Sequence, residues 1–164
     1  MPKRDLKPMA DIIFDVDGTL MNIEHRRHHV AIEVDDYGFR VEKKRDWKAF
    51  RKAMADDTPN EDIVMMAKLL KEAGHRIIIA TGRLQSERAV TLKQLLGAGV
   101  VFDAIYTREN VHEFKSDSEV KEKFLDRMKA DGYNPTMAFD DRQKVVDMWR
   151  RNGLRVFQVD KGDF

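Results

Sequence analysis

Short, continuous apolar runs that alternate with amphipathic helical segments constrain the fold of this chain more than any other feature. Apolar strands are predicted at residues 11–15, 76–80 and 136–140, with a weaker one at 102–107 and a last one at 154–159. Strands that are apolar on both faces are typical of a parallel sheet covered by helices on each side. The sequence therefore predicts an α/β fold, a doubly wound parallel sheet.

Helices are predicted between these strands at residues 60–73, 86–96, 117–130 and 143–151. In each of them apolar residues recur at the three- and four-residue spacing that places them on one face. Ser116 or Asp117 is expected to cap the third helix. The residues expected to face the core are Ile63, Met65, Met66, Ala67, Leu70, Ala89, Leu92, Leu95, Leu96, Val120, Phe124, Leu125, Met128, Val145, Val146 and Trp149.

Residues 21–59 break the alternation of strands and helices. They carry much charge and no strong strand, and within them residues 46–54 predict a short amphipathic helix with Trp47, Phe50 and Met54 on one side. Residues 57–60 are interpreted as a turn and the start of the next helix. We expect a small helical cap, inserted after the first strand, within a single domain of residues 1–164.

Composition excludes several classes of protein. The chain has no cysteine, so disulfides and thiolate chemistry are ruled out. Its net charge of +1 differs from the strongly basic balance of proteins that coat nucleic acid. No apolar run has the length of a membrane span, and residues 1–8 hold no apolar signal core. The expectation is a soluble, cytoplasmic protein.

Acidic and hydroxyl side chains follow three of the predicted strands. Asp15 and Asp17 follow the first, Thr81 follows the second, and Asp140 and Asp141 follow the fourth. The carboxyl ends of parallel strands meet at one edge of a sheet, which is where ligands bind in such folds. Four converging acids need a counter-ion, and an oxygen-only ligand set favours Mg²⁺.

A phosphate group is the ligand that this arrangement would attract. Thr81 and the backbone N–H groups after the first strand, at Gly18, can donate hydrogen bonds to phosphate oxygens. Asp117 and Lys121 lie one helical turn apart, so Lys121 can add a positive charge from the same face. One carboxylate is then free to act as a nucleophile and its neighbour as a general acid and base.

These motifs resemble those of the haloacid dehalogenase superfamily of phosphohydrolases. The chain has IIFDVDGT for its first motif, IIIATGR for its second, Lys121 for its third and the acidic pair Asp140-Asp141 for its fourth. The resemblance implies that Asp15 forms an aspartyl-phosphate and that Asp17 serves as general acid and base. It also implies that Thr81 and Lys121 bind the phosphoryl group. Mg²⁺ would be held by Asp15, the Asp17 carbonyl and Asp141, with Asp140 close by.

A closer similarity is to the phosphatase domain of phage polynucleotide kinase/3′-phosphatases. It rests on residues 139–164 (FDDRQKVVDMWRRNGLRVFQVDKGDF), on residues 81–83, on the spacing from Asp117 to Lys121, and on Arg26 eleven residues after Asp15. It implies a polynucleotide 3′-phosphatase that acts in the repair of DNA or RNA ends. The residues expected to bind the substrate are Gly18, Arg26, Gly82, Arg83, Arg108, Asp117 and Arg142.

Departures from that family leave alternatives open. There is no GxxxxGK[ST] motif, so 5′-kinase activity would need another chain, and a separate kinase or ligase is a possible partner. The segment 112–117 differs from the family pattern, which weakens any role for Lys115. The alternative substrates are a 5′- or 3′-nucleotide or another small phosphomonoester. A module that only binds nucleic-acid ends is a further alternative.

Two local features also have more than one interpretation. His25, His28 and His29 have a spacing that suits a transition metal, but no fourth ligand is evident, and a basic edge near the phosphate site is the preferred interpretation. Trp47 and Phe50 either stack on a nucleobase or form the core of the cap.

Overall fold

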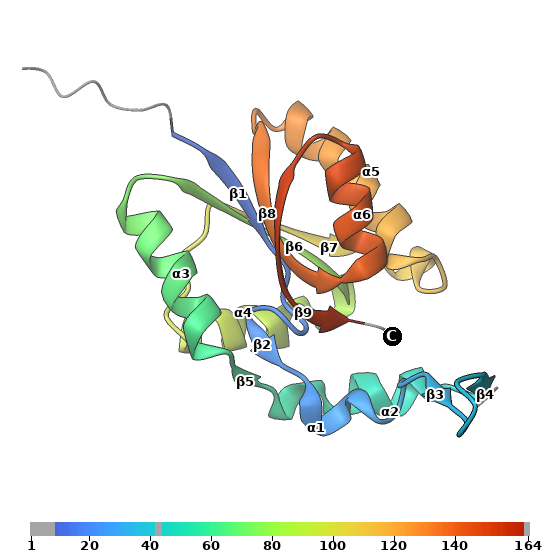
Figure 1. Cartoon of the computed structure of the whole chain (residues 1–164). Helices are drawn as coiled ribbons and strands as arrows, with labels where there is room; N and C mark the ends of the chain where they lie inside the picture. Colours follow the sequence, from blue (N-terminus) through green and yellow to red (C-terminus); the bar gives the residue numbers. More distant parts are fainter. Residues whose placement is uncertain (1–8, 42–43, 163–164) are drawn as a thin grey trace, which may run out of the picture.

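The computed structural model of the chain describes residues 9–41 and 44–162, so the prediction about residues 1–8 lies outside it. Within the described residues, five parallel strands form the central sheet in the order β7-β6-β1-β8-β9 (Figure 1). The predicted doubly wound sheet is confirmed. The strands are Asp11–Phe14 (β1), Arg76–Leu84 (β6), Ala104–Arg108 (β7), Pro135–Arg142 (β8) and Arg155–Gly162 (β9).

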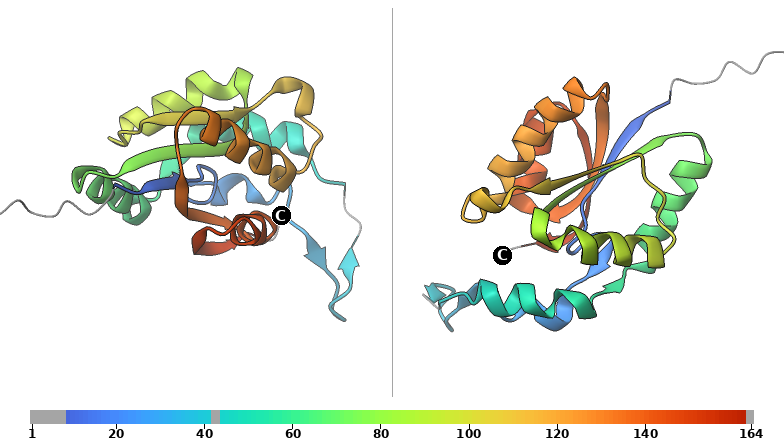
Figure 2. Two further views of the ribbon diagram at one scale, coloured as in Figure 1. Left: turned by 90° about the horizontal axis from the view of Figure 1, so that it is seen from above. Right: turned by 180° about the vertical axis from the view of Figure 1, so that it is seen from behind.

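Helices cover both faces of the sheet (Figures 1 and 2). Helices α3 (Glu61–Glu72) and α4 (Arg88–Gly97) lie on one face, and α5 (Asp117–Ala130) and α6 (Gln143–Arg151) lie on the other. Two short 3₁₀ turns, η2 (Gln85–Glu87) and η3 (Asn110–His112), complete the connections. In the described part of the chain, no helix combines the length and the apolar character of a membrane span.

Alternate residues of β1 enter two separate cores, because successive side chains of a strand point to opposite faces. Ile12 and Phe14 join the core that contains Leu95 of α4, whereas Ile13 joins the core that contains Phe124 of α5 and Trp149 of α6. All the apolar residues predicted to face inward from α5 and α6 are buried, and Ser116 caps α5 by accepting from the Glu119 N–H.

The predicted inward faces of α3 and α4 are partly wrong. Met65 and Met66 are 53% and 36% exposed, and Leu96 is 65% exposed. On α3 the buried residues are Val64 and Ala67, so Met66 lies at the edge of the apolar stripe and Met65 lies outside it. On α4, Thr91 and Leu95 are buried and Ala89 is exposed. When a helix has a weak apolar stripe, its sequence does not determine which face packs against the sheet, so the inward face depends on tertiary packing.

The insertion after β1 forms a cap over the carboxyl edge of the sheet (Figure 1). Its two ends are joined by pairing of β2 (Met21–Asn22) with β5 (Thr58–Pro59). Between them lie helices α1 (Glu24–Arg27) and α2 (Trp47–Lys52) and the 3₁₀ turn η1 (Ala53–Asp56). Ile23, Val30 and Phe50 form a small core of the cap itself.

The cap is not only helical, because residues 33–41 form a hairpin of β3 (Glu33–Val34) and β4 (Arg40–Val41). Asp35 accepts hydrogen bonds from the backbone N–H groups of Tyr37 and Phe39, and Gly38 has φ +84°. An aspartate that caps its own turn, followed by a glycine with positive φ, is a typical hairpin signal. The sequence predicts no strong strand here, and the two strands of this hairpin are only two residues long each.

The topology places the ligand site at the carboxyl end of β1. The chain builds β6 and β7 on one side of β1 and then crosses to build β8 and β9 on the other. In open parallel sheets such a reversal leaves a crevice at the carboxyl ends of the strands, where ligands bind. Asp15 continues directly from β1, and its N–H donates to the Phe139 carbonyl of β8 at 3.0 Å.

At the opposite edge of the sheet, Asp11 should make the stability depend on pH. It accepts from Arg76 Nε at 2.6 Å, from Arg76 Nη2 at 2.7 Å and from the Asn134 N–H at 2.6 Å. Burial alone would raise the pKa of Asp11, but the hydrogen bonds from Arg76 and Asn134 hold it below its usual value. The unfolded chain therefore binds more protons, and this stabilisation falls as the pH drops through the folded-state pKa.

We expect Asp11→Asn to lower the free energy of unfolding by about 1–3 kcal/mol at neutral pH. The difference from the unmodified chain should persist above a pH of about 4, the usual aspartate range, and disappear at lower pH. Denaturant unfolding followed from pH 2 to 7 measures it. A difference that stays constant over that range would contradict the assignment to the Asp11 carboxylate.

Candidate active site

Three buried carboxylates meet at the carboxyl edge of the sheet. Asp15 follows β1, and Asp140 and Asp141 lie near the end of β8. One carboxylate oxygen from each lies within 4.8 Å of the other two. The three residues are at most 5% exposed. The structure therefore brings together the three predicted carboxylate ligands, and coordination by the Asp17 carbonyl stays a prediction.

Lys121 reaches this group from the first turns of α5. Its Nζ lies 2.8 Å from Asp15 Oδ1, 3.1 Å from Asp140 Oδ2 and 3.5 Å from Asp117 Oδ2. Burial would lower the pKa of Lys121, but the carboxylates of Asp117, Asp140 and Asp15 hold it well above its usual value. The ammonium group therefore stays charged beside Asp15, as predicted from its place on the helix.

The acids remain under electrostatic strain despite Lys121. Burial and the Asp140 carboxylate raise the pKa of Asp15 well above its usual value, and the same two causes raise that of Asp141 to about 7. Asp141 Oδ2 is buried with no hydrogen-bond partner among the described residues, and it lies 3.7 Å from Arg27 Nη2. A buried carboxylate oxygen without a donor, close to two further carboxylates, fits a hard divalent cation such as Mg²⁺.

A tight loop after β1 leaves room for Asp141. Gly18 has φ +78°, and a Cβ built on it would lie 2.1 Å from Asp141 Oδ2. The Gly18 N–H donates to the Met21 carbonyl at 2.9 Å, and Thr19 Oγ1 donates to Asp15 Oδ2 at 3.3 Å. Gly18 therefore permits both the tight turn of the loop and the close approach of Asp141 of β8 to this loop.

We expect Gly18→Ala to destabilise the fold and to disrupt the carboxylate group, because the new methyl group must displace Asp141. The matched control is Gly38→Ala in the cap hairpin, where φ is +84° but nothing lies within 4 Å of the added Cβ. The control should cost only the backbone strain of about 1–2 kcal/mol. Thermal melting and phosphatase activity of both variants measure the difference, and equal losses would contradict the steric explanation.

Asp17 is held by two buried arginines rather than by the other acids. Its Oδ1 accepts from Arg26 Nη2 at 2.8 Å and from Arg83 Nε and Nη2 at 2.9 and 2.8 Å. Burial alone would raise the pKa of Asp17, but the charges of Arg83 and Arg26 bring it below its usual value. The arginines therefore favour the ionised form of the Asp17 carboxylate.

Asp57 completes this network, and the sequence did not reveal it. It accepts from Arg26 Nε at 2.7 Å and Nη2 at 2.6 Å, and from Arg83 Nη2 at 2.9 Å. His25 Nε2 lies 2.8 Å from Asp57 Oδ1, the oxygen that also accepts from Arg26 Nε. The interpretation of residues 57–60 as only a turn is therefore incomplete. Asp57 contacts partners 26 and 31 residues away, and no local pattern indicates such pairing.

Arg26 and Arg83 are 0% and 1% exposed, and all three nitrogens of each guanidinium donate hydrogen bonds within the protein. Direct contact of Arg26 with a substrate phosphate stays a prediction. Its observed neighbours are Asp17, Asp57 and the Phe50 carbonyl. The arrangement makes the two arginines positioning groups for Asp17.

The segment Thr81-Gly82-Arg83 belongs to β6 itself, which continues to Leu84 beyond the predicted end. Thr81 is buried, and its Oγ1 accepts from the Arg83 N–H at 3.1 Å. A Cβ on Gly82 would lie 2.1 Å from Asp117 Oδ1. Gly82 therefore allows the start of α5 to approach the strand closely.

Arg108 and Arg142 both contact Asp117 at the start of α5. Arg108 Nη2 donates to Asp117 Oδ1 at 3.2 Å, and Arg142 Nη1 lies 3.8 Å from Asp117 Oδ2. Burial alone would raise the pKa of Asp117, but Lys121, Arg142 and Arg108 bring it below its usual value. Asp117 thus links Lys121 to the two arginines, and it is not the N-cap, because Ser116 occupies that position.

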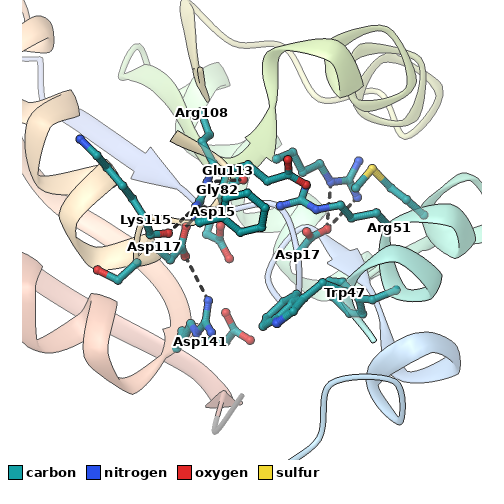
Figure 3. Close-up of a pocket in the computed structure, with 16 residues that line it drawn as sticks. Asp15, Asp17, Trp47, Arg51, Gly82, Arg108, Glu113, Lys115, Asp117 and Asp141 are labelled. Carbon is teal, nitrogen blue, oxygen red and sulfur yellow. Dashed lines mark hydrogen bonds and ion pairs between the residues drawn. The ribbon is translucent and has the colours of Figure 1, made fainter. Parts of the chain in front are cut away.

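A cavity of about 320 Å³ opens over the carboxylates (Figure 3). Asp15, Asp17 and Asp141 line it, whereas the predicted residues Gly18, Arg26, Thr81, Lys121 and Asp140 are not part of its wall. Its volume lies at the lower end of the range of ligand pockets, roughly 300–1,000 Å³. The other lining residues are Trp47, Phe50, Arg51, Met54, Gly82, Arg83, Arg108, Glu113, Phe114, Lys115, Ser116, Asp117 and Arg142.

The histidines of the cap do not form a metal centre in the described residues. His25 contacts Asp57, and the rings of His28 and His29 lie 4.0 Å apart between centroids. The described histidines, aspartates and glutamates include one group with metal-binding geometry, the carboxylates of Asp15, Asp140 and Asp141. The interpretation of these histidines as a basic edge near the phosphate site stays a prediction.

The fold is the Rossmann-like fold of the haloacid dehalogenase superfamily. A structure of a predicted phosphatase from Clostridium acetobutylicum superposes with a TM-score of 0.63 at 17% identity, covering 93% of this chain and 85% of that chain. A substrate-bound phosphoserine phosphatase gives a TM-score of 0.56 at 18% identity, covering 92% and 87%. At these identities the likeness concerns the fold.

The family is narrower than the fold. A model of the polynucleotide kinase PNKP phosphatase domain matches residues 9–164. The chain belongs to this family, and it is a phosphatase of the haloacid dehalogenase superfamily.

Chains in structures of the Pnkp1/Rnl/Hen1 complex and of the Pnkp1/Rnl/Hen1 RNA repair complex are both 27% identical to this chain, with TM-scores of 0.73. Those matches cover 96% and 95% of this chain but only 48% and 44% of the matched chains. The chain thus spans about half the length of these relatives.

Proposed function

We propose that the chain is a Mg²⁺-dependent polynucleotide 3′-phosphatase that acts through an aspartyl-phosphate on Asp15. The observation that carries this proposal is the Asp15 carboxylate in the wall of the cavity, 2.8 Å from the Lys121 ammonium. A buried carboxylate beside a fixed positive charge suits attack on a phosphoryl group, whose negative charge the ammonium offsets. The family match supports the nucleic-acid end as the substrate.

In the first step Asp15 Oδ attacks phosphorus, and the bond from phosphorus to the 3′-oxygen breaks. Asp17, protonated at this stage, gives its proton to the leaving oxygen. Arg26 and Arg83 favour the ionised form of Asp17 in the free site, and the negative charge of the bound phosphate would raise the pKa of Asp17 so that it can take up this proton. In the second step the Asp17 carboxylate takes a proton from water, and the resulting hydroxide attacks phosphorus. This releases inorganic phosphate and regenerates Asp15.

Lys121 keeps its charge through both steps and attracts the phosphoryl oxygens, and Thr81, buried on β6, would bind the phosphoryl group with it. The residues that would hold Mg²⁺ are Asp15, Asp141 and the carbonyl of Asp17, with Asp140 placing Lys121. The ion would neutralise the negative charge of the phosphate when bound.

An RNA end is one candidate substrate, because the similar chains come from structures of the Pnkp1/Rnl/Hen1 complex and of the RNA repair complex of the same name. A kinase or ligase in a separate chain, or elsewhere in a longer protein, would complete end repair. A second candidate is hydrolysis of free nucleotides. The cavity volume favours that alternative, because about 320 Å³ is close to the smallest ligand pockets.

The experiment compares hydrolysis of 3′-phosphorylated RNA and DNA oligonucleotides with that of 3′- and 5′-mononucleotides, with Mg²⁺ and with a chelator. The proposal expects release of phosphate from the oligonucleotides only when Mg²⁺ is present. Cleavage of the 5′-mononucleotide alone would contradict it, and so would full activity in the chelator.

A further inference from the structure

Two exposed aromatic side chains line the cavity from different parts of the fold. Trp47 comes from α2 of the cap and is 38% exposed, and Phe114 comes from the loop between η3 and α5 and is 97% exposed. In Figure 3, Trp47 lies on the cap side of the cavity, across from Lys115 and Asp117. The cavity that contains Asp15 is therefore lined by one aromatic ring from the cap and one from the loop before α5.

Phe114 is presented on a braced loop. Arg108 is 6% exposed, and its Nη1 donates to the carbonyls of His112, Glu113 and Lys115, which flank Phe114 on both sides. Its Nε donates to the Gly82 carbonyl of β6 at 3.0 Å. The buried Arg108 thus connects the loop to the sheet, while the ring of Phe114 at the tip of the loop is exposed to solvent. Such an arrangement lowers the entropy cost of binding a flat ligand.

Trp47 is also fixed in place. It opens α2 directly after Asp46, which caps the helix by accepting from the Ala49 N–H at 2.9 Å. Its ring meets the edge of Phe50 at 5.6 Å between centroids and 86° between planes. Phe50 itself is 5% exposed and lies 4.1 Å from the Arg26 guanidinium. Of the two aromatic residues considered from the sequence, Phe50 belongs to the cap core, whereas Trp47 is partly exposed in the cavity wall, with the Arg45 guanidinium 5.9 Å from its ring centroid.

Building on the proposed 3′-phosphatase function, we propose that Trp47 and Phe114 hold the base of the 3′-terminal nucleotide while its phosphate lies at Asp15. The volume of about 320 Å³ suits one nucleotide, and both rings belong to the same cavity as the acids. Aromatic rings bind bases of any sequence, because every base has a flat π surface. Lys115, beside Phe114 in the cavity wall, adds positive charge for the preceding phosphodiester.

The test uses two oligonucleotides that both end in a 3′-phosphate, one with a normal terminal nucleotide and one whose terminal residue lacks its base. The unmodified chain should hydrolyse the abasic oligonucleotide about 5- to 100-fold less efficiently in kcat/KM, the range expected for loss of base stacking. Trp47→Leu and Phe114→Leu should each lower kcat/KM for the normal oligonucleotide by a similar factor, chiefly through KM. Their effect on the abasic oligonucleotide should be much smaller.

Conservative variants and a distant aromatic residue serve as controls. Trp47→Phe and Phe114→Tyr keep a ring and should retain most of the efficiency, which separates stacking from a general weakening of the cap. Tyr37→Leu removes an aromatic side chain that is 87% exposed on the hairpin and is not in the cavity wall, and it should change nothing.

Equal losses on the normal and abasic substrates, or no loss in either leucine variant, would overturn the base-binding role alone. Failure of the unmodified chain to hydrolyse either oligonucleotide, with mononucleotides still cleaved, would overturn the proposed function and this inference with it. The two failures are therefore distinguishable from one set of assays.

Discussion

Asp15→Asn should reduce phosphatase turnover by at least about 10⁴-fold, because the carboxamide cannot attack phosphorus and carries no charge. The change keeps the size of a side chain that is 5% exposed, so the fold should be retained. It also removes one of the clustered acids. Burial and the Asp140 carboxylate raise the pKa of Asp15, which means that its negative charge is unfavourable in this cluster. We therefore expect the melting temperature without Mg²⁺ to stay the same or rise, a trade of stability for function.

Single-turnover assays and thermal melting test this pair of effects. The matched control is Asp126→Asn, which removes an exposed carboxylate from α5 and should alter neither measurement. Trapping of a covalent phosphoryl-enzyme from the unmodified chain, and its absence in Asp15→Asn, would identify the nucleophile directly. Retained turnover in Asp15→Asn would remove Asp15 from that role and would favour a different function for the acidic group.

The parts of the fold that sequence reasoning predicted are those determined by local patterns. The continuous apolar runs at Ile12–Ile13 and Ile77–Ile79 could only be buried on both faces, which determines a parallel sheet. Its topology then brings the acids after β1 and within β8 together, as the spacing of the motifs predicted. The roles of Asp15, Lys121 and Asp141 are implied by the resemblance of their motifs to those of the haloacid dehalogenase superfamily, and they remain predictions that the variants test.

The parts that sequence reasoning missed depend on contacts between distant segments. Asp57 looks like a turn residue until the cap folds back and places it between Arg26 and Arg83. Phe114 looks like an ordinary loop residue until Arg108 braces its loop beside the cavity. The prediction of the inward faces of α3 and α4 was partly wrong for a similar reason. Their weak apolar stripes allow several orientations of each helix, and only packing against the sheet distinguishes them.

The cap and the core are joined through the same charged network that holds Asp17. Asp57, at the end of the cap, bonds both Arg26 of α1 and Arg83 of β6, and Gln94 Nε2 of α4 donates to the Met54 carbonyl at 2.8 Å. Any change that frees the cap therefore also loosens the arginines that orient Asp17. A substitution in this network should therefore lower both the stability of the fold and the rate of catalysis.

Asp57→Ala tests that coupling. The side chain of Asp57 is fully buried between two buried arginines, so its removal leaves both guanidinium groups short of a counter-ion. Loss of one partner from a buried ion pair costs about 3–5 kcal/mol, and we expect a loss of that size in the free energy of unfolding. With Arg26 and Arg83 no longer held, Asp17 should move from its place in the cavity wall, and kcat should fall by at least about 10²-fold.

Denaturant unfolding and phosphatase assays well below the melting temperature measure the two effects of Asp57→Ala. The adjacent Asp56→Ala is the control, because Asp56 is exposed and its loss should leave both quantities nearly unchanged. Asp57→Asn keeps an acceptor for one arginine and should give a smaller loss, which provides a folded variant for the assay. A variant Asp57→Asn that lost stability but kept full kcat would contradict the coupling. Asp57 would then stabilise only the cap, and Arg26 and Arg83 would orient Asp17 without help from Asp57.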